Sequence, residues 1–357
     1  MAFAPPGLGR GVTLMDSHGL RRALKSIGPP GLFFSVDKPA VGTSPLQFQA
    51  NRPAAEAKRE AIAETAGLWY GVAAMKTHDT FSRRSFLAGL AAAPLGAAAV
   101  AAAAAKHIPI GLELYSVRND LAKDLAGTVR KVAGMGYQCV EFYAPYYDWT
   151  PGEARQVRRE LDDLGIRCYS THNGTKSFTP EGIGKAMELN HILGTRYVVL
   201  ASAGKVSGAD GWKRVAELLN KANHTMSPHG LHPGYHNHDA EWIPVDGQKP
   251  IEILATNTDK RIMLQLDVGT CLETGNDPVA WIRRNPGRIR SLHLKNWAPQ
   301  GGYKVLFSEG VAPWKKIFAA AESVGGVEYY LIEQEGSRYS ELKTAELCLQ
   351  EYRKLRA

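Results

Sequence analysis

The stretch RIMLQLDVGTCLETGNDPVAWIRRN, residues 261–285, decides the fold. Residues 261–269 are a short apolar run that fits a buried strand, and residues 277–285 have the apolar spacing of a helix. A strand followed by a helix is the repeating unit of an α/β protein with a parallel sheet. How often this unit recurs along the chain therefore determines the class of fold.

The same strand–helix unit recurs seven more times between residues 106 and 357. Strands are predicted at 108–114, 137–143, 166–171, 195–202, 231–237, 261–269, 288–295 and 328–336. Helices are predicted at 121–136, 152–165, 182–194, 210–226, 250–257, 277–285, 311–325 and 341–355. Eight units in a segment of this length predict a single closed (β/α)8 TIM barrel. An open doubly wound sheet also alternates, but no GxGxxG turn follows the first strand.

Composition and charge narrow the class of protein further. A hydrophobic fraction of 44% is ordinary for a globular protein. The formal net charge is +8, of which +5 falls within residues 1–105 and only +3 within residues 106–357. The predicted barrel is therefore nearly balanced, which argues against a nucleic-acid partner. The four cysteines form no CxxC pair and are predicted to be small buried residues.

Residues 75–105 have the layout of a twin-arginine export signal. Met75 opens MKTHDTFSRRSFL, and its arginine pair precedes a mildly hydrophobic, alanine-rich run that ends in small residues. Pro94 interrupts the run and alanine is weakly apolar, so no stable membrane span is expected after processing. An alanine-rich linker helix is the structural alternative. We predict cleavage after Ala105 and an exported, periplasmic protein.

Residues 1–74 are predicted to be a disordered or non-native N-terminal extension. They are rich in Pro, Gly and Ala and show no sustained periodicity. Because export signals act from the N-terminus, Met75 is the expected start of the natural chain. The predicted organisation is thus an extension (1–74), a signal peptide (75–105) and a barrel (106–357).

Polar side chains gather where the predicted strands end, which is where a (β/α)8 barrel places its chemistry. Side chains alternate across a strand, so residues two positions apart, such as His236 and His238, share a face. A charged group that faces inward must be paired or metal-bound, and converging nitrogen and oxygen donors favour a divalent cation. The strand-end residues are Glu141, His172, His236, His238, Asp267, His293, Lys295, Glu333 and Glu335.

Structural roles are the alternative for each of these residues. Glu141 also fits an ion pair with an arginine, and His172 also fits a capped loop residue. This alternative is weakest for Asp267, His293 and Glu333, because they end consecutive strands that are predicted to be buried.

Residues 106–357 resemble the sugar phosphate isomerase/epimerase family, the xylose isomerase-like TIM barrels. The motifs that carry the resemblance are VEFY (140–143), STHNG (170–174), GYHNHDAEW (234–242), LDVGT (266–270), HLKNW (293–297) and IEQEG (332–336). In this family one metal ion is usually held at the ends of strands five to eight. The resemblance implies that one Mn, Mg, Co or Zn ion is bound by His236, Asp267, His293 and Glu333. His236 stands where many members have a glutamate, although a Tyr-His-Asn-His version resembles a recognised branch.

The resemblance also implies a metal-dependent isomerase or epimerase that works through an enediolate, whose negative charge the metal stabilises. Glu333 is the expected metal-bridging acid/base, and Glu141 or His238 is the candidate for the second proton-transfer group. Lys295 is expected to stabilise the oxyanion or to contact a sugar hydroxyl. Two alternatives stay open, which are a 3-keto-glycoside lyase with the same metal site and a non-catalytic exported sugar-binding protein.

The predicted substrate is an unphosphorylated sugar or keto-sugar. An exported enzyme meets few phosphorylated sugars, and no Gly-rich phosphate-binding turn is evident in the seventh and eighth strand–helix loops. The aromatic run YAPYYDW (143–149), together with Trp242 and Trp297, fits either a sugar-stacking surface or a hydrophobic lid. Twin-arginine export of a folded protein implies metal loading before export. Whether the barrel forms a homo-oligomer is left open.

Overall fold

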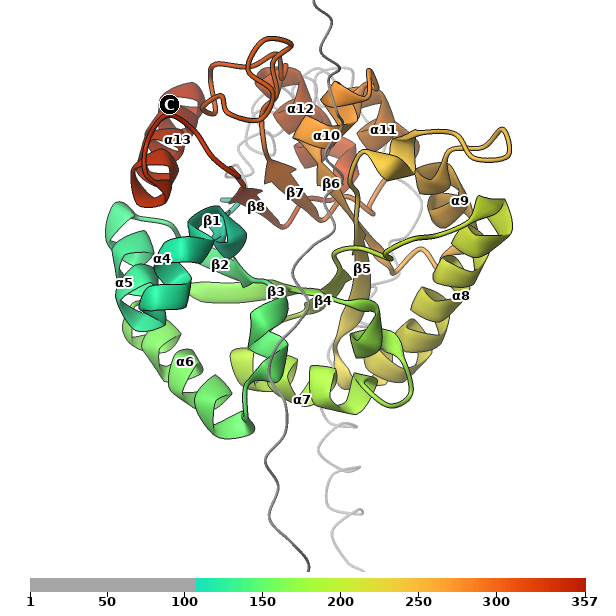
Figure 1. Cartoon of the computed structure of the whole chain (residues 1–357), viewed down its shortest axis with the longest axis horizontal. Helices are drawn as coiled ribbons and strands as arrows, with labels where there is room; N and C mark the ends of the chain where they lie inside the picture. Colours follow the sequence, from blue (N-terminus) through green and yellow to red (C-terminus); the bar gives the residue numbers. More distant parts are fainter. Residues whose placement is uncertain (1–106) are drawn as a thin grey trace, which may run out of the picture. The chain divides into compact units, whose positions relative to one another are not determined.

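The computed structural model describes residues 107–357, so the expectations for residues 1–74 and 75–105 lie outside the described residues. Within that range the chain forms a closed barrel of eight parallel strands in the order β1 to β8 (Figure 1). The barrel closes where β1 pairs with β8. The predicted single (β/α)8 barrel is therefore confirmed. No helix of the described range has the length and apolar character to cross a membrane.

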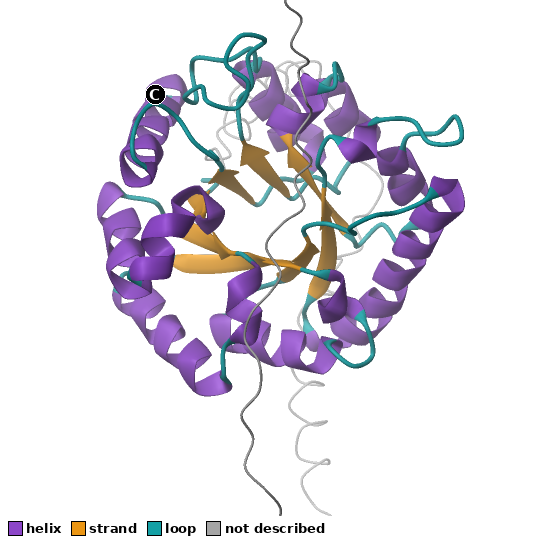
Figure 2. Ribbon diagram, in the orientation of Figure 1, coloured by secondary structure: helices purple, strands orange, loops and turns teal. Residues whose placement is uncertain are grey.

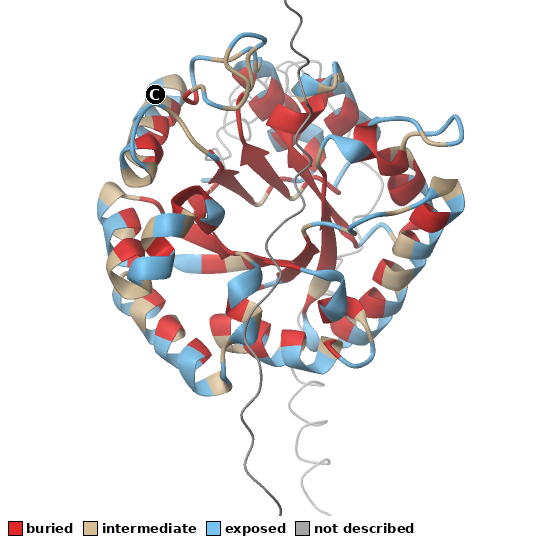
Figure 3. Ribbon diagram, in the orientation of Figure 1, coloured by how far each residue is buried: buried red, intermediate tan, exposed pale blue. Residues whose placement is uncertain are grey.

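The strands are short and lie almost wholly within the predicted segments. They are β1 (Ile110–Glu113), β2 (Cys139–Phe142), β3 (Arg167–Asn173), β4 (Tyr197–Leu200), β5 (His232–His236), β6 (Met263–Asp267), β7 (Ser291–Leu294) and β8 (Tyr329–Ile332). Only β3 runs beyond its predicted end, by two residues. Because most strand residues are buried on both faces of the barrel (Figure 3), the apolar runs mark the strands well.

Helices surround the barrel on its outer side (Figure 2). They are α4 (Arg118–Lys123), α5 (Leu125–Met135), α6 (Pro151–Asp163), α7 (Ile183–Leu193), α8 (Gly208–Met226), α9 (Pro250–Asn257), α10 (Val268–Glu273), α11 (Pro278–Arg284), α12 (Trp314–Ala320) and α13 (Glu341–Arg356). A π-helical turn, Ala321–Gly325, continues α12. Short 3-10 turns follow several strands, at Leu114–Val117, Ala144–Asp148, Thr175–Phe178 and Ala240–Trp242.

Two features of the helices differ from the prediction. The segment 121–136 is two helices, because Asp124 has an extended backbone and its side chain accepts a hydrogen bond from Gly127 N at 2.9 Å as the N-cap of α5. Helix α10 was not predicted, and it begins directly after β6 with Asp267 as its N-cap. In both places a capping side chain, which periodicity does not reveal, determines the boundary.

The core has an outer layer between strands and helices and a separate cluster of six buried residues contributed by the strands. That cluster consists of Cys139, Tyr197, Val199, Met263, Tyr329 and Leu331. All four cysteines are buried and free, as predicted. The polar side chains that end the strands lie beyond this apolar layer, at the carboxyl end of the barrel.

Candidate active site

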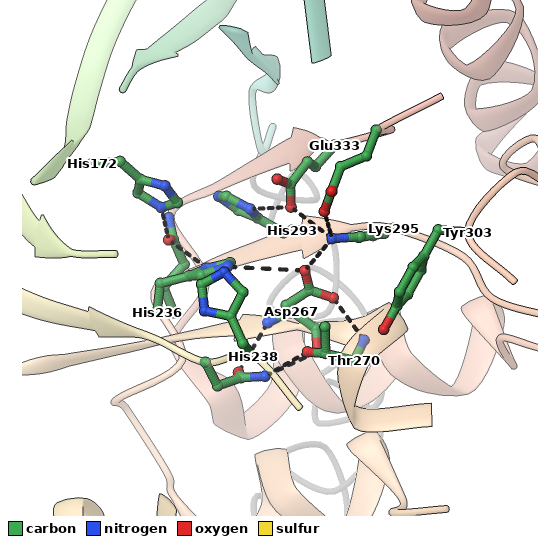
Figure 4. A network of polar contacts seen from close by, with 12 residues as sticks. His172, His236, His238, Asp267, Thr270, His293, Lys295, Tyr303 and Glu333 are labelled. Carbon is green, nitrogen blue, oxygen red and sulfur yellow. Dashed lines mark hydrogen bonds and ion pairs between the residues drawn. The ribbon is translucent and has the colours of Figure 1, made fainter. Parts of the chain in front are cut away.

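Four residues at the ends of the last four strands meet at one place (Figure 4). His236 ends β5, Asp267 ends β6, His293 lies in β7 and Glu333 directly follows β8. Each offers a nitrogen or oxygen that lies within 4.8 Å of the atoms offered by the others. All four are buried, and the most exposed of them, Glu333, is 6% exposed. The barrel therefore brings together the four residues that the sequence singled out as metal ligands.

His236 is held so that one ring nitrogen faces the cluster. Its Nδ1 lies 3.1 Å from Oε1 of Gln265, and its Nε2 lies 3.9 Å from Oδ2 of Asp267. When Nδ1 carries the hydrogen and donates it to Gln265, the lone pair of Nε2 points at the other donors. Burial, together with the charges of the neighbouring histidines, holds the pKa of His236 well below its usual value. The ring is therefore neutral, as a metal ligand must be.

His293 has a carboxylate on each side of its ring. Its Nε2 lies 2.7 Å from Oε2 of Glu141, and its Nδ1 lies 3.0 Å from Oε2 of Glu333. Burial alone would lower the pKa of His293, but these two carboxylates outweigh it and raise the pKa well above its usual value. A ring nitrogen that donates to a carboxylate while the other faces a cluster is how metal-binding histidines are commonly oriented.

The two carboxylate oxygens of Asp267 have different partners: one accepts a hydrogen bond from the backbone, and the other faces the cluster. Its Oδ1 accepts the hydrogen bond from Thr270 N at 2.9 Å that caps α10. Its Oδ2 lies 3.3 Å from Nζ of Lys295. Asn237, which follows β5, accepts a hydrogen bond from the Asp267 backbone nitrogen at 3.0 Å. The start of a helix and the end of a neighbouring strand thus fix the carboxylate in place.

Lys295 is the cation of this cluster and is 2% exposed. Its Nζ lies 3.3 Å from Asp267 and 3.6 Å from Glu333, and it also donates to Glu335. Burial would lower the pKa of Lys295, but the surrounding carboxylates raise it well above its usual value. In turn, burial would raise the pKa of Glu333, but Lys295 and His293 hold it well below its usual value. Both groups are therefore charged near neutral pH.

Glu141 contacts the site rather than an arginine. It accepts hydrogen bonds from Gln265 Nε2 at 3.0 Å, from His293 Nε2 at 2.7 Å and from the hydroxyl of Ser170. His172 also belongs to the site, because its Nε2 lies 3.2 Å from Glu141 and its ring stacks on His293 with centroids 5.0 Å apart. The structural alternatives for both residues, an arginine pair and a loop cap, are not what the structure shows.

His238 lies at the rim of the site. It follows β5, is partly exposed, and its ring centroid is 4.9 Å from that of His236 (Figure 4). Its backbone nitrogen donates to Glu241 at 2.8 Å, which fixes the turn after the strand. His238 is therefore near the cluster of His236, Asp267, His293 and Glu333 without being part of it.

The aromatic residues proposed for a sugar pocket divide into two groups. Trp242 is 3% exposed and packs edge-on against Trp281, with ring centroids 5.2 Å apart. Tyr146 is also buried and donates its hydroxyl hydrogen to Asn173. These two rings belong to the hydrophobic core rather than to an open pocket surface. Tyr143 is only partly buried and contacts Tyr115, which is 38% exposed.

Two buried residues of the site were missed by the sequence reasoning. Gln265 connects Glu141, His172 and His236, and Glu113 ends β1 with no exposed surface. Both carried a signal in the sequence. Gln265 is two positions before Asp267 and so shares its face of β6, and Glu113 closes the first strand as the other acids close theirs.

Comparison with known proteins identifies one matching family model and a set of distant relatives. The family model described as a xylose isomerase-like TIM barrel matches residues 129–355. Inosose dehydratase of Geobacillus thermodenitrificans (strain NG80-2) is 24% identical over 164 residues, which are 41% of this chain and 54% of that protein. The match thus spans about half the length of this curated relative.

Solved structures share the barrel. A sugar phosphate isomerase/epimerase from Parabacteroides distasonis ATCC 8503 superposes with a TM-score of 0.59 at 24% identity, covering 70% of this chain and 94% of that one. The IOLI protein, solved with a binding zinc atom, superposes with a TM-score of 0.51 at 16% identity, covering 69% and 96%. At these identities the likeness to solved structures establishes the fold alone.

Proposed function

Because the chain belongs to the xylose isomerase-like TIM barrel family, we propose that it is a metal-dependent isomerase or epimerase of an unphosphorylated sugar or keto-sugar. The observation that carries the proposal is the buried cluster of His236, Asp267, His293 and Glu333. Enzymes of this family include isomerases, epimerases and dehydratases, and these reactions on sugars begin with removal of a proton beside a carbonyl.

The donor set suits one divalent cation. His293, whose pKa is raised in the metal-free protein, would release a proton as the ion binds. Two neutral imidazoles and two carboxylates then carry a charge of about −2, which a divalent ion balances, and mixed nitrogen and oxygen donors suit Mn, Co or Zn as well as Mg. His236 and His293 each have one ring nitrogen tied to a second side chain and the other facing the cluster. When bound, the ion would stabilise negative charge on a substrate carbonyl oxygen.

The side chains around the cluster suggest how protons are handled. Glu333 is the acid/base of the proposal, because its carboxylate is ionised and lies at the cluster beside Lys295. Lys295 keeps a positive charge where an oxyanion would form. His238 is the better candidate for the second proton transfer, since it lies at the rim and is partly exposed. Glu141 accepts hydrogen bonds from three side chains, and we assign it the positioning of His293.

Elimination is the second candidate reaction. The curated relatives named inosose dehydratase favour it, because a dehydratase removes water from its substrate. In this chain the corresponding proposal is a lyase that cleaves a 3-keto-glycoside with the same metal site. Both reactions need the same first proton transfer, so the products distinguish them.

The proposal is tested in deuterium oxide with the manganese-loaded protein and a panel of free sugars, keto-sugars and 3-keto-glycosides. An isomerase or epimerase introduces deuterium at one carbon of the recovered sugar, whereas a lyase releases the aglycone, and NMR detects both. The control is Asp267→Ala, which we expect to lose about one equivalent of bound metal and all exchange. Unchanged metal content in Asp267→Ala, or tight sugar binding without exchange in the loaded protein, contradicts the proposal.

A further inference from the structure

We propose a second cation site, formed by Glu113, Glu141 and His172 at the ends of β1, β2 and β3. Each of the three offers a donor atom, and these atoms lie within 4.8 Å of one another. The two glutamates have no exposed surface and His172 is 7% exposed. Glu113 and Glu141 are direct partners in the β1–β2 register, so their side chains leave the sheet on the same side. The site does not depend on the reaction proposed above.

Glu113 has an oxygen without a partner. Its Oε2 accepts a hydrogen bond from the Tyr115 backbone nitrogen at 2.6 Å. Its Oε1 is buried and has no hydrogen-bond partner among the described residues. Buried carboxyl oxygens are almost always paired, because a buried polar atom has lost its hydrogen bonds to water. A bound cation supplies the partner that the protein does not.

Two of the four carboxyl groups buried at this end of the barrel have no lysine or arginine partner. Four carboxylates are buried at this end of the barrel, at Glu113, Glu141, Asp267 and Glu333. The buried lysine, Lys295, contacts only the last two of them and Glu335. Within residues 107–357, neither Glu113 nor Glu141 forms an ion pair with a lysine or arginine. The half of the cluster without a lysine or arginine is thus the half that contains the unpartnered oxygen.

His172 is placed to serve as the nitrogen ligand. Its Nε2 lies 2.7 Å from Oε1 of Gln265 and 3.2 Å from Oε2 of Glu141, so one hydrogen faces two acceptors. A cation on Nε2 would replace that hydrogen and free a lone pair of Glu141, while Gln265 would keep its contact with His236 at 3.1 Å. One imidazole and two carboxylates are a donor set suited to Mn or Zn.

A direct hydrogen bond joins the two sites. Glu141 accepts it from His293, a residue of the first cluster, at 2.7 Å. A carboxylate that binds one cation and orients a ligand of the other couples the affinities of the two sites. Two neighbouring cations would hold two adjacent oxygens of a polyhydroxylated substrate, which suits a carbohydrate.

The test is metal stoichiometry, which requires no substrate. Chelator-stripped protein is equilibrated with Mn²⁺ alone, and then with Zn²⁺ alone, and bound metal is measured by mass spectrometry and titration calorimetry. We expect two equivalents in the wild type and one in Glu113→Gln, whose amide oxygen keeps the hydrogen bond from Tyr115. The matched control Glu188→Gln, exposed on α7, should keep two. Circular dichroism checks folding, and His172→Asn replaces Glu113→Gln if that variant does not fold.

The outcomes separate this inference from the proposed function. A wild type that binds one equivalent, kept by Glu113→Gln and lost in Asp267→Ala, overturns the second site and leaves the first. Two equivalents that fall to one in Glu113→Gln, but stay at two in Asp267→Ala, support the second site and overturn the assignment of the first. A wild type that binds no metal overturns both.

Discussion

Lys295 is the only buried lysine among residues 107–357 and serves as a counter-ion for Asp267 and Glu333. In the absence of metal its ammonium offsets part of the negative charge of the two carboxylates. With a divalent ion in the cluster the same ammonium repels that ion. One side chain therefore both stabilises the metal-free protein and limits the affinity for metal.

Replacing this lysine by an apolar side chain should separate the two effects. In the presence of a chelator, Lys295→Met should lower the free energy of unfolding by about 3–5 kcal/mol, because two buried carboxylates lose their partner. Saturating Mn²⁺ should recover part of that loss, because the ion neutralises the same carboxylates. Urea denaturation with and without Mn²⁺ measures both values.

The control is Lys315→Met, an exposed lysine on α12, which should change stability little under either condition. If Lys295→Met lost equal stability with and without Mn²⁺, the lysine would act through packing alone and not as a counter-ion.

At the level of single residues, the sequence was sufficient to predict which side chains meet but not how they are connected. Strand-end position placed nine polar residues at one end of the barrel. The family resemblance selected His236, Asp267, His293 and Glu333 from them, and their atoms do lie together. The contact between Glu141 and His293 joins residues 152 positions apart across the barrel interior. Such a contact depends on barrel closure and on side-chain rotamers, which no local pattern reveals.

Among elements, the strands were predictable and the short helices were not. Double burial gives each strand an uninterrupted apolar run, so all eight were located from the sequence. Helices α4 and α10 have six residues each, too few for periodicity to identify. Capping by Asp124 and Asp267 determines where α5 and α10 begin.

Strand β1 gives a test of packing inside the barrel. A Cβ atom added at Gly111 would lie 2.6 Å from the backbone oxygen of Cys139, which cannot move without shifting β2. Gly111→Ala should therefore lower the free energy of unfolding by about 1–3 kcal/mol, as overpacked cores do. Because Glu113 is on the same strand, metal content should also fall. Urea denaturation and metal analysis measure the two effects.

The matched control is Gly134→Ala on the exposed side of α5, where an added Cβ meets nothing within 4 Å. It should raise stability by about 0.5–1 kcal/mol, because alanine is the better helix former. A Gly111→Ala protein as stable as the wild type would show that β1 and β2 adjust without cost.

For the whole molecule, barrel closure requires that the mature chain begin before β1. Strand β1 starts at Ile110 and pairs with both β2 and β8, so a chain that starts at Lys106 keeps every strand. We propose twin-arginine export with cleavage after Ala105. Protein recovered from the periplasm should begin at Lys106, and replacing Arg83 and Arg84 by lysine should retain it in the cytoplasm. N-terminal sequencing and cell fractionation check this, and an exported form that keeps residues 1–74 contradicts it.

Asp267 has three roles at once: it is the last residue of β6, the N-cap of α10 and a member of the cluster. No spacer residue separates the strand from the helix. An insertion at this junction would uncap the helix and move a ligand at the same time. An insertion after Glu273, where α10 has ended, would leave both the cap and the ligand in place. We therefore expect the loop from Thr274 to Asn276, ahead of the α11 cap Asp277, to accept grafted segments that reshape the mouth of the barrel while the ligands keep their positions.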